Sequence, residues 1–299
     1  NSTTGIFGAA AAAAKLLRLD EQHTAWALGI AATQASGLRE MFGTMCKSFS
    51  VARAAESGLL AAMLAREGYT SSDRAIEAPR GFAQVFMPGS DPAPIIERLG
   101  ETYEVSYNIY KPFACGIVLH AAIDACIRAR KEHGFDLEQI EKVTLRVNPI
   151  VTEITGKREP QSGLEGKFSV YHCAAVALIH GLAGEPQYSD ERVKNPTVIA
   201  LRDKVEAIPD RSLRRDQAHV LVRLRDGRTY EKKIEHAIGT LANPLSDQDL
   251  RDKFTGLAEG ILAPEVTSKV IDLCWNLEHL EDFSALPVAT ARALKDEHA

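Results

Sequence analysis

The stretch "HVLVRLRDGRTYEKKIE", residues 219–235, places two runs with strand-like alternation on either side of the dipeptide Asp226–Gly227. Alternation of apolar and polar side chains with a period of two is typical of a strand with one buried face. An Asp-Gly pair is preferred in the two-residue turns that join antiparallel strands. The stretch therefore predicts a β-hairpin, and a hairpin favours an α+β fold over a doubly wound parallel sheet.

Two further stretches alternate in the same way, "YEVSYNIYK" at 103–111 and "KVTLRVN" at 142–148, and we expect strands there. Helical spacing of apolar residues dominates the rest of the chain, and residues 38–50 are expected to form a loop. The predicted helices cover residues 8–19, 21–37, 51–68, 117–134, 165–181, 247–259, 264–280 and 283–295.

The order of these elements indicates two domains, because helices come first, strands mixed with helices follow, and helices return at the end. We expect an all-helical domain formed by residues 1–101 and 262–299, with a smaller α+β domain at 102–261 inserted into it. The inserted domain is expected to contain an antiparallel sheet, since its strands do not alternate regularly with helices.

The composition is that of an ordinary globular protein, with 45% hydrophobic and 25% charged residues over 299 positions. The net charge is −5 and acidic and basic residues are interleaved, so we expect no nucleic-acid partner and no polybasic membrane patch. The apolar stretches are too short and too interrupted to span a bilayer, so no membrane partner is expected either.

The cysteines are scattered along the chain, and none belongs to a Cys-x-x-Cys pair. An odd number of scattered cysteines favours reduced thiols and a cytoplasmic location over a disulfide framework. The sequence also has no zinc or iron–sulfur spacing, no His-Glu-x-x-His and no Gly-rich phosphate loop. We therefore predict neither a metal nor a cofactor. The five cysteines are Cys46, Cys115, Cys126, Cys173 and Cys274.

The segment "GTMCKSFSVARAAESGLLAAMLAREGYT", residues 43–70, resembles the G-T-M-x-K…A-x-R-A-A…G-[VL]-L segment of the MmgE/PrpD family. That family includes 2-methylcitrate dehydratases, cis-aconitate decarboxylases and iminodisuccinate epimerases. Four further stretches resemble the family in the same order along the chain: "TGIFGAAAAAAKLLRLD" (4–20), "YKPFACGIVLHAAIDA" (110–125), "LEGKFSVYHCAAVALIHG" (164–181) and "HAIGTLANPLSDQDLRDKF" (236–254).

The resemblance implies a two-domain enzyme, usually a homodimer, that acts on small di- or tricarboxylates without a metal or a cofactor. It also implies a large helical domain and a smaller α+β domain, in agreement with the order of elements above. Family members carry a long segment before the part that resembles "TGIFGA", so this sequence is expected to lack the family's N-terminal part. Catalytic acidic and histidine positions are expected in that part. The identity of the proton-abstracting base is left open, and that part is one candidate source of it.

Three cations are candidates for contact with a polyanionic substrate. Lys47 aligns with the family's active-site lysine, and the resemblance implies a role as carboxylate clamp or proton donor. Lys111 aligns with a second pocket lysine and is expected to anchor the substrate. Arg53 is a third candidate for substrate binding, although a structural ion pair with Glu56 is the favoured interpretation. Removing a proton next to a carboxylate builds negative charge, which fixed cations stabilise in the transition state.

Three ring side chains are candidates for catalytic proton transfer. His172 stands where many relatives have a tyrosine in K-F-S-x-x-Y, and an imidazole titrates near neutral pH, so it can act as an acid or a base. Its neighbour Tyr171 is the second candidate, with a core position and a bonded hydroxyl as the alternative interpretation. His120 aligns with a histidine common in the family, and a core position is its alternative too.

Decarboxylating relatives carry a histidine five residues after the lysine of the K-x-[FY] loop, where this chain has Gly116. This departure counts against cis-aconitate decarboxylation and leaves dehydration or epimerisation. We therefore predict a metal-independent hydro-lyase that eliminates water from a small hydroxy di- or tricarboxylate such as 2-methylcitrate. An epimerase or isomerase of a small dicarboxylate is the alternative within enzymes. A catalytically silent carboxylate-binding homologue is the alternative from another class.

Overall fold

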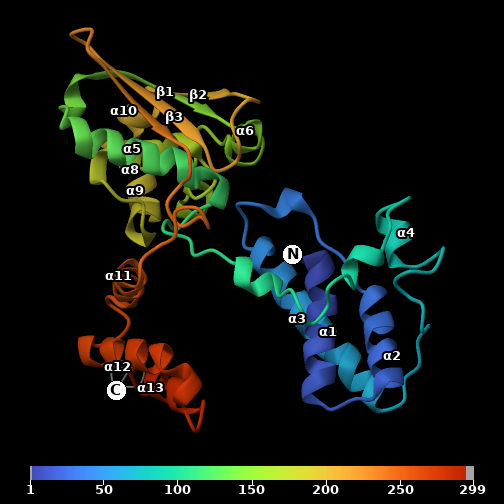
Figure 1. The fold of residues 1–299 in the computed structure, drawn as a ribbon. Coiled ribbons are helices and arrows are strands. Elements are labelled where there is room, and N and C mark those ends of the chain that lie inside the picture. The colour runs from blue at the N-terminus through green and yellow to red at the C-terminus, as the bar shows by residue number, and fades with distance from the viewer. Residues whose placement is uncertain (1, 294–299) are drawn as a thin grey trace. The chain divides into compact units, whose positions relative to one another are not determined.

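The computed structural model describes residues 2–293, which divide into two compact units, one ending at Tyr107 and the other beginning at Asn108. Each unit has a hydrophobic core of its own. The first unit is helical and the second combines helices with a four-stranded sheet, as the ribbon in Figure 1 shows. The α+β fold class predicted from the sequence is therefore confirmed.

The core of the first unit is formed by three helices, α1 (Ser2–Leu16), α2 (Glu21–Ala32) and α3 (Cys46–Arg66). Small residues let α1 and α3 approach closely, since a Cβ added to Gly58 would lie 2.5 Å from the Cβ of Ala9. Asp20 caps α2 at the predicted start, accepting a hydrogen bond from the backbone N–H of His23 at 2.8 Å. The shorter helices of this unit are α4 (Phe82–Phe86), η1 (Arg39–Met41), η2 (Ala93–Ile95) and η3 (Glu104–Tyr107).

The predicted loop at 38–50 is partly wrong, because α3 already begins at Cys46. Helical hydrogen bonding starts there although the N-cap residue, Met45, makes no side-chain capping bond. Lys47 therefore lies in the first turn of a long helix and not in a loop.

The second unit contains the sheet, in which the strands are ordered β2-β1-β3-β4. The predicted hairpin is confirmed, with Gly227 in the turn at a φ of +86°, a conformation that glycine adopts without strain. Burial alternates along β3, as expected for a strand with one face on the core. The strands are β1 (Ile140–Val147), β2 (Val205–Pro209), β3 (Ala218–Leu224) and β4 (Thr229–Ile234).

The sheet is mixed, which corrects the prediction of an antiparallel sheet. β1 pairs with β3 in antiparallel fashion but with β2 in parallel, where Val143 lies opposite Val205. A parallel pair needs a long crossover connection, and the helical segment between Val147 and Val205 provides it. β2 is five residues long and ends in Pro209, so its sequence gave no alternation strong enough to predict it.

The predicted strand at 103–111 is wrong. Its residues form the 3-10 helix η3 and irregular backbone, and no strand occurs there. Tyr103, Val105 and Tyr107 alternate with polar residues, yet all three are exposed. The alternating apolar side chains therefore form no buried face, and pairing this segment with a sheet would gain no stabilisation from burial.

Two helices cover one face of the sheet, α5 (His120–His133) and α8 (Val170–His180), and they pack on each other (Figure 1). Both end in a glycine with left-handed backbone, Gly134 and Gly181, a common way for a helix to end. The remaining helices of this region are η4 (Ile117–Leu119), η5 (Leu137–Gln139), α6 (Pro149–Thr155), α7 (Gly163–Gly166), η6 (Glu185–Tyr188), α9 (Asp190–Val193) and α10 (Pro196–Arg202).

The described part of the chain ends in helices, as predicted. They are α11 (Asp247–Ala258), α12 (Pro264–Trp275), η7 (Leu277–His279) and α13 (Ala285–Ala293). α12 contacts both α11 and α13. The last two residues of the helix predicted at 283–295 lie outside the described part of the chain. The assignment of residues 262–299 to the helical domain stays a prediction, as do the other domain boundaries.

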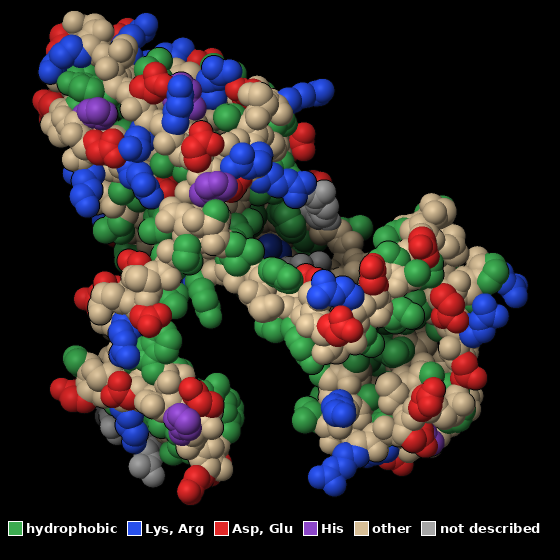
Figure 2. All heavy atoms as spheres, in the orientation of Figure 1, with side chains coloured by type: hydrophobic (Ala, Val, Ile, Leu, Met, Phe, Trp, Pro, Cys, Tyr) green, Lys and Arg blue, Asp and Glu red, His purple; other side chains and the backbone are tan. Residues whose placement is uncertain are grey.

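Acidic and basic side chains are interspersed on the face drawn in Figure 2. Many of them form ion pairs, such as Lys142 with Glu206 at 2.6 Å and Arg146 with Asp210 at 2.7 Å. Over residues 2–293, no helix combines the length and the apolar character that crossing a membrane requires.

Candidate active site

Lys47 is exposed at the N-terminal end of α3, and its Nζ lies 6.0 Å from the ring centroid of Phe42. In the described part of the chain, no carboxylate lies within ion-pair distance of this ammonium group. Its position is electrostatically costly, because the N-terminus of a helix already carries partial positive charge. A cation placed there without a carboxylate partner suits the binding of an anion from solution.

Arg53 forms the ion pair that was the favoured interpretation of the sequence. Its Nη1 lies 2.6 Å from Oε2 of Glu56, and both side chains are at least half exposed. Such a pair contributes little to stability, about 0.3–0.5 kcal/mol on a helix surface. The role of Arg53 in substrate binding stays a prediction.

Lys111 lies in the second unit, at the start of a segment that leads into α5. Its Nζ donates a hydrogen bond to the carbonyl oxygen of Cys115 at 3.1 Å. The backbone N–H of Ala114 donates to the carbonyl of Ala183, and that of Gly116 donates to the carbonyl of Lys167, both at 3.1 Å. These bonds tie the irregular backbone that follows Lys111 to the segments around Lys167 and Ala183, which fixes the place from which the Lys111 side chain extends.

His120 is buried at the first residue of α5, with its ring edge-on to Phe113 at a centroid distance of 5.4 Å. Among the described residues, its Nε2 has no hydrogen-bond partner. Burial alone does not separate a core position from a catalytic one, so the role of His120 in proton transfer stays a prediction.

A cluster of buried thiols and a phenol adjoins His120. The Sγ of Cys173 lies 3.3 Å from the hydroxyl oxygen of Tyr188. Burial raises the pKa of the Cys115 thiol, but hydrogen bonds with Cys173 and His120 outweigh it and lower that pKa to about 5. Burial raises the pKa of Cys173 well above its usual range, so the two thiols lose one proton readily and the second only with difficulty. The sequence did not predict this cluster, because its members come from separate elements.

His172 is fully enclosed in α8. Its Nε2 lies 2.9 Å from the carbonyl oxygen of Gln187, so the ring donates there and its Nδ1 is the unprotonated nitrogen. Burial lowers the pKa of this imidazole despite the hydrogen bond to Gln187. Tyr171 is also buried, and its ring lies under the guanidinium of Arg158 at 4.5 Å. Contact of either ring with a substrate stays a prediction.

The six predicted site residues are divided between the two units. Lys47 and Arg53 belong to the first unit. The other four, Lys111, His120, Tyr171 and His172, belong to the second unit, where they lie on the segment before α5 and at the starts of α5 and α8.

An imidazole–carboxylate pair that the sequence analysis missed lies at one end of the sheet. Nδ1 of His236, which follows β4, is 2.8 Å from Oδ2 of Asp216, which precedes β3. Burial raises the pKa of Asp216, but hydrogen bonds with His236 and Arg214 outweigh it and hold that pKa below its usual value. The hydrogen bond fixes the orientation of the His236 ring through its Nδ1. The β3–β4 hairpin creates it, so no local pattern predicts it.

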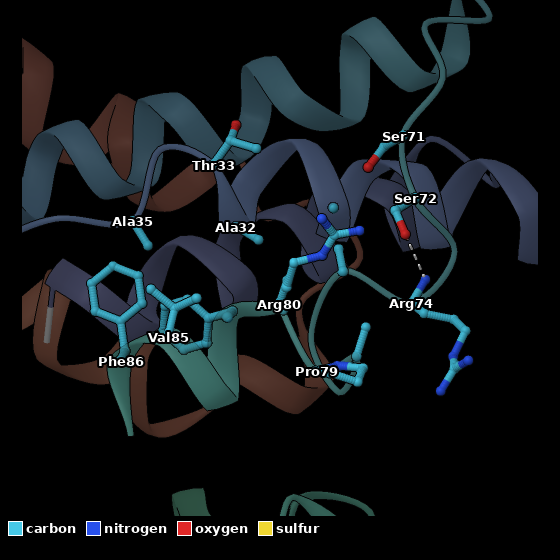
Figure 3. A pocket seen from close by; sticks show the side chains of 15 residues that line it. Ala32, Thr33, Ala35, Ser71, Ser72, Arg74, Pro79, Arg80, Val85 and Phe86 are labelled. Carbon is cyan, nitrogen blue, oxygen red and sulfur yellow. Dashed lines mark hydrogen bonds between the residues drawn. The ribbon is translucent and has the colours of Figure 1, made fainter. Parts of the chain in front are cut away.

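The first unit also contains a pocket of about 700 Å³ between α2, the segment 71–81 and α4. Figure 3 shows the Arg80 side chain extending toward Ser71 and Ser72 across this pocket. The hydroxyl of Ser72 accepts a hydrogen bond from the backbone N–H of Arg74 at 3.2 Å. None of the predicted site residues lines the pocket.

Within the described residues, no group of three or more His, Cys, Asp and Glu side chains could hold a metal ion. The expectation of metal-independent chemistry stays a prediction.

Comparison with known families decides the classification. The model of the MmgE/PrpD N-terminal domain matches residues 1–95, and that of the MmgE/PrpD C-terminal domain matches residues 113–277. The chain belongs to the MmgE/PrpD family. The resemblance read from the sequence is thereby confirmed.

Several curated members of the MmgE/PrpD family are similar to this chain. Cis-aconitate decarboxylase of Mus musculus is 28% identical over 296 residues, covering 95% of this chain and 60% of that protein. The enzyme of the same name from Homo sapiens is 28% identical over 295 residues, covering 95% and 61%. That of Aspergillus terreus is 26% identical over 307 residues, covering 94% and 62%. The chain thus spans about 60% of the length of the curated relatives it matches.

Proposed function

We propose that this MmgE/PrpD protein is a lyase that eliminates water from a small hydroxy tri- or dicarboxylate. The observation that carries the proposal is the position of Lys47, a cation without a carboxylate partner among the described residues, at the start of α3. From its resemblance to the family's G-T-M-x-K segment, we infer that Lys47 corresponds to the family's active-site lysine. Lys111 provides a second cation, held by its bond to the carbonyl of Cys115.

The two lysines act on carboxylates in this mechanism. A base takes the proton alpha to a carboxylate, which builds negative charge on the substrate. The hydroxyl group then accepts a proton and leaves as water while the double bond forms. A cation that contacts the carboxylate stabilises this charge, and a well-placed donor lowers the barrier by roughly 3–4 kcal/mol. Neither lysine is assigned as the general base of this reaction.

Gly116 supports dehydration over decarboxylation. It occupies the position of the histidine found in decarboxylating relatives, so the chain lacks an imidazole there. The backbone does not require glycine, since its φ is −62° and an added Cβ would meet only ordinary contacts, the nearest being Thr155 Cγ2 at 3.5 Å. The local backbone would therefore accept a histidine at this position, and it does not explain why the chain has glycine there.

Decarboxylation is the second candidate, and the names of the similar proteins favour it, since each of those cited above is a cis-aconitate decarboxylase. Their identities of 26–28% support a shared class of lyase and leave the substrate open.

We retain the homodimer and the cytoplasmic location as further parts of the proposal.

The proposal is tested by incubating the full chain with citrate, 2-methylcitrate and cis-aconitate in heavy water. Formation of a conjugated double bond from a hydroxy acid supports the dehydratase. Release of carbon dioxide from cis-aconitate supports the decarboxylase instead. Deuterium uptake without elimination supports an epimerase. If no substrate reacts but a polycarboxylate raises the melting temperature, the protein is a silent carboxylate-binding homologue.

A further inference from the structure

The backbone on both sides of Lys111 is in close contact with the loop 236–243, which follows strand β4 in the same unit. Gly239 has a φ of +86°, and a Cβ added to it would lie 2.6 Å from the carbonyl oxygen of Tyr110 and 2.7 Å from Cδ of Pro112. Only glycine fits both the conformation and the space. The contact therefore holds the residues immediately before and after Lys111.

The loop that carries Gly239 is itself fixed to helix α5. The backbone N–H of Ile238 donates to Oδ2 of Asp124 at 3.1 Å, and the other carboxylate oxygen of Asp124 lies 2.7 Å from Nε of Arg128. Asp124 is only 4% exposed. A buried carboxylate is stable only with such partners, so both bonds are part of its local structure.

The loop is also closed on itself. The backbone N–H of Gly239 donates to the carbonyl of Asn243 at 2.8 Å, and Nδ2 of Asn243 donates to the carbonyl of His236 at 3.1 Å. A closed loop with one end on a buried carboxylate is a rigid support for whatever packs against it.

We propose that Asp124 and Gly239 are positioning residues for Lys111: Asp124 holds the loop 236–243 to helix α5, and Gly239 holds the backbone from which the lysine side chain extends. The expected effect of these residues on KM rests on the proposed function of Lys111 as a substrate anchor. Their expected effect on the position of the Lys111 ammonium group does not.

The test compares two glycines that share a backbone conformation. Gly227, in the β3–β4 turn, also has a φ of +86°, but an added Cβ would meet nothing within 4 Å. Gly239→Ala and Gly227→Ala thus both place an alanine at a φ of +86°, while only the first pushes on Tyr110 and Pro112. Lysines are labelled with ¹³C-methyl groups, and the Lys111 signal is assigned by its loss in Lys111→Arg.

We expect Gly239→Ala to shift the Lys111 signal and leave that of Lys47 in place, whereas Gly227→Ala shifts neither. We also expect the KM for the turned-over polycarboxylate to rise about tenfold in Gly239→Ala, with kcat changed less. A folded Gly239→Ala protein with an unmoved Lys111 signal would overturn the proposal. A shifted signal in a protein whose wild type turns over none of the acids supports the positioning role and refutes the proposed function.

A second pair of variants tests the buried carboxylate. Asp124→Asn keeps an oxygen that accepts the hydrogen bond of Ile238, whereas Asp124→Ala removes it. Positioning predicts that the Lys111 signal shifts in Asp124→Ala and returns toward the wild-type position in Asp124→Asn. Equal shifts in the two variants would contradict it. Should Asp124→Ala fail to fold, the two glycine variants decide the question without it.

Discussion

Nδ1 of His236 lies 2.8 Å from Oδ2 of Asp216, although 20 positions separate the two residues in the chain. The β3–β4 hairpin brings them together at the end of the sheet from which the loop 236–243 departs. Asp216 also accepts a hydrogen bond from Nε of Arg214 at 3.2 Å. The carboxylate thus has two cationic or potentially cationic partners, and these favour its ionised form.

The first prediction concerns acid stability. Because these partners lower the pKa of Asp216 in the folded protein, its stabilising contribution is fully present above the ordinary value of 3.8 and is lost as the pH falls through the lower folded-state pKa. Asp216→Asn should therefore lower the free energy of unfolding by up to about 1 kcal/mol at neutral pH. Urea unfolding over a range of pH should show this difference shrinking below pH 3.8. A difference that grows on acidification would contradict the assignment.

The second prediction concerns His172, whose buried ring donates to the carbonyl of Gln187. His172→Phe removes that donor and leaves a buried carbonyl unsatisfied, at a cost of about 1–3 kcal/mol. Burial lowers the folded-state pKa of His172 below the ordinary 6.5, so the unfolded chain takes up the proton first. The wild type should thus lose stability relative to His172→Phe as the pH falls below 6.5. A stability difference that is constant between neutral and mildly acidic pH would show that the ring is not held neutral.

The third prediction concerns the choice between reactions. Gly116→His places an imidazole where decarboxylating relatives have one, and an added Cβ meets no contact closer than 3.5 Å. The variant should fold with a change in stability of about 1 kcal/mol or less. We expect it to release carbon dioxide from cis-aconitate faster than the wild type does. Gly116→Gln, which has a side chain of similar length without a titrating ring, is the matched control and should not show the gain.

Much of the fold could be predicted from the sequence wherever the signal is local. The hairpin follows from Asp226–Gly227, and the start of α2 follows from the capping side chain of Asp20. β2 could not be predicted, because its place in the sheet depends on hydrogen bonds to β1, far away in the chain. The segment 103–111 shows the opposite error, since it alternates like a strand but has no apolar face to bury.

The candidate site shows the same limit. Lys47 and Lys111 are predicted from the family resemblance, but the contacts around them cannot be predicted from the sequence. The contact of Gly239 with Tyr110 and the bond from Ile238 to Asp124 join residues more than a hundred positions apart. A histidine within a helical stretch, such as His120, gives no local sign of whether it faces the core or a substrate.

The most direct test of the central claim is the turnover of the reactive polycarboxylate by Lys47→Met, compared with Lys15→Met. Both lysines are exposed on helices of the first unit, and only Lys47 is assigned to substrate. We predict a fall in kcat/KM of roughly 100-fold or more for Lys47→Met, since one transition-state cation is lost, with an almost unchanged melting temperature. Lys15→Met should retain the wild-type rate. Wild-type turnover by Lys47→Met would contradict the account.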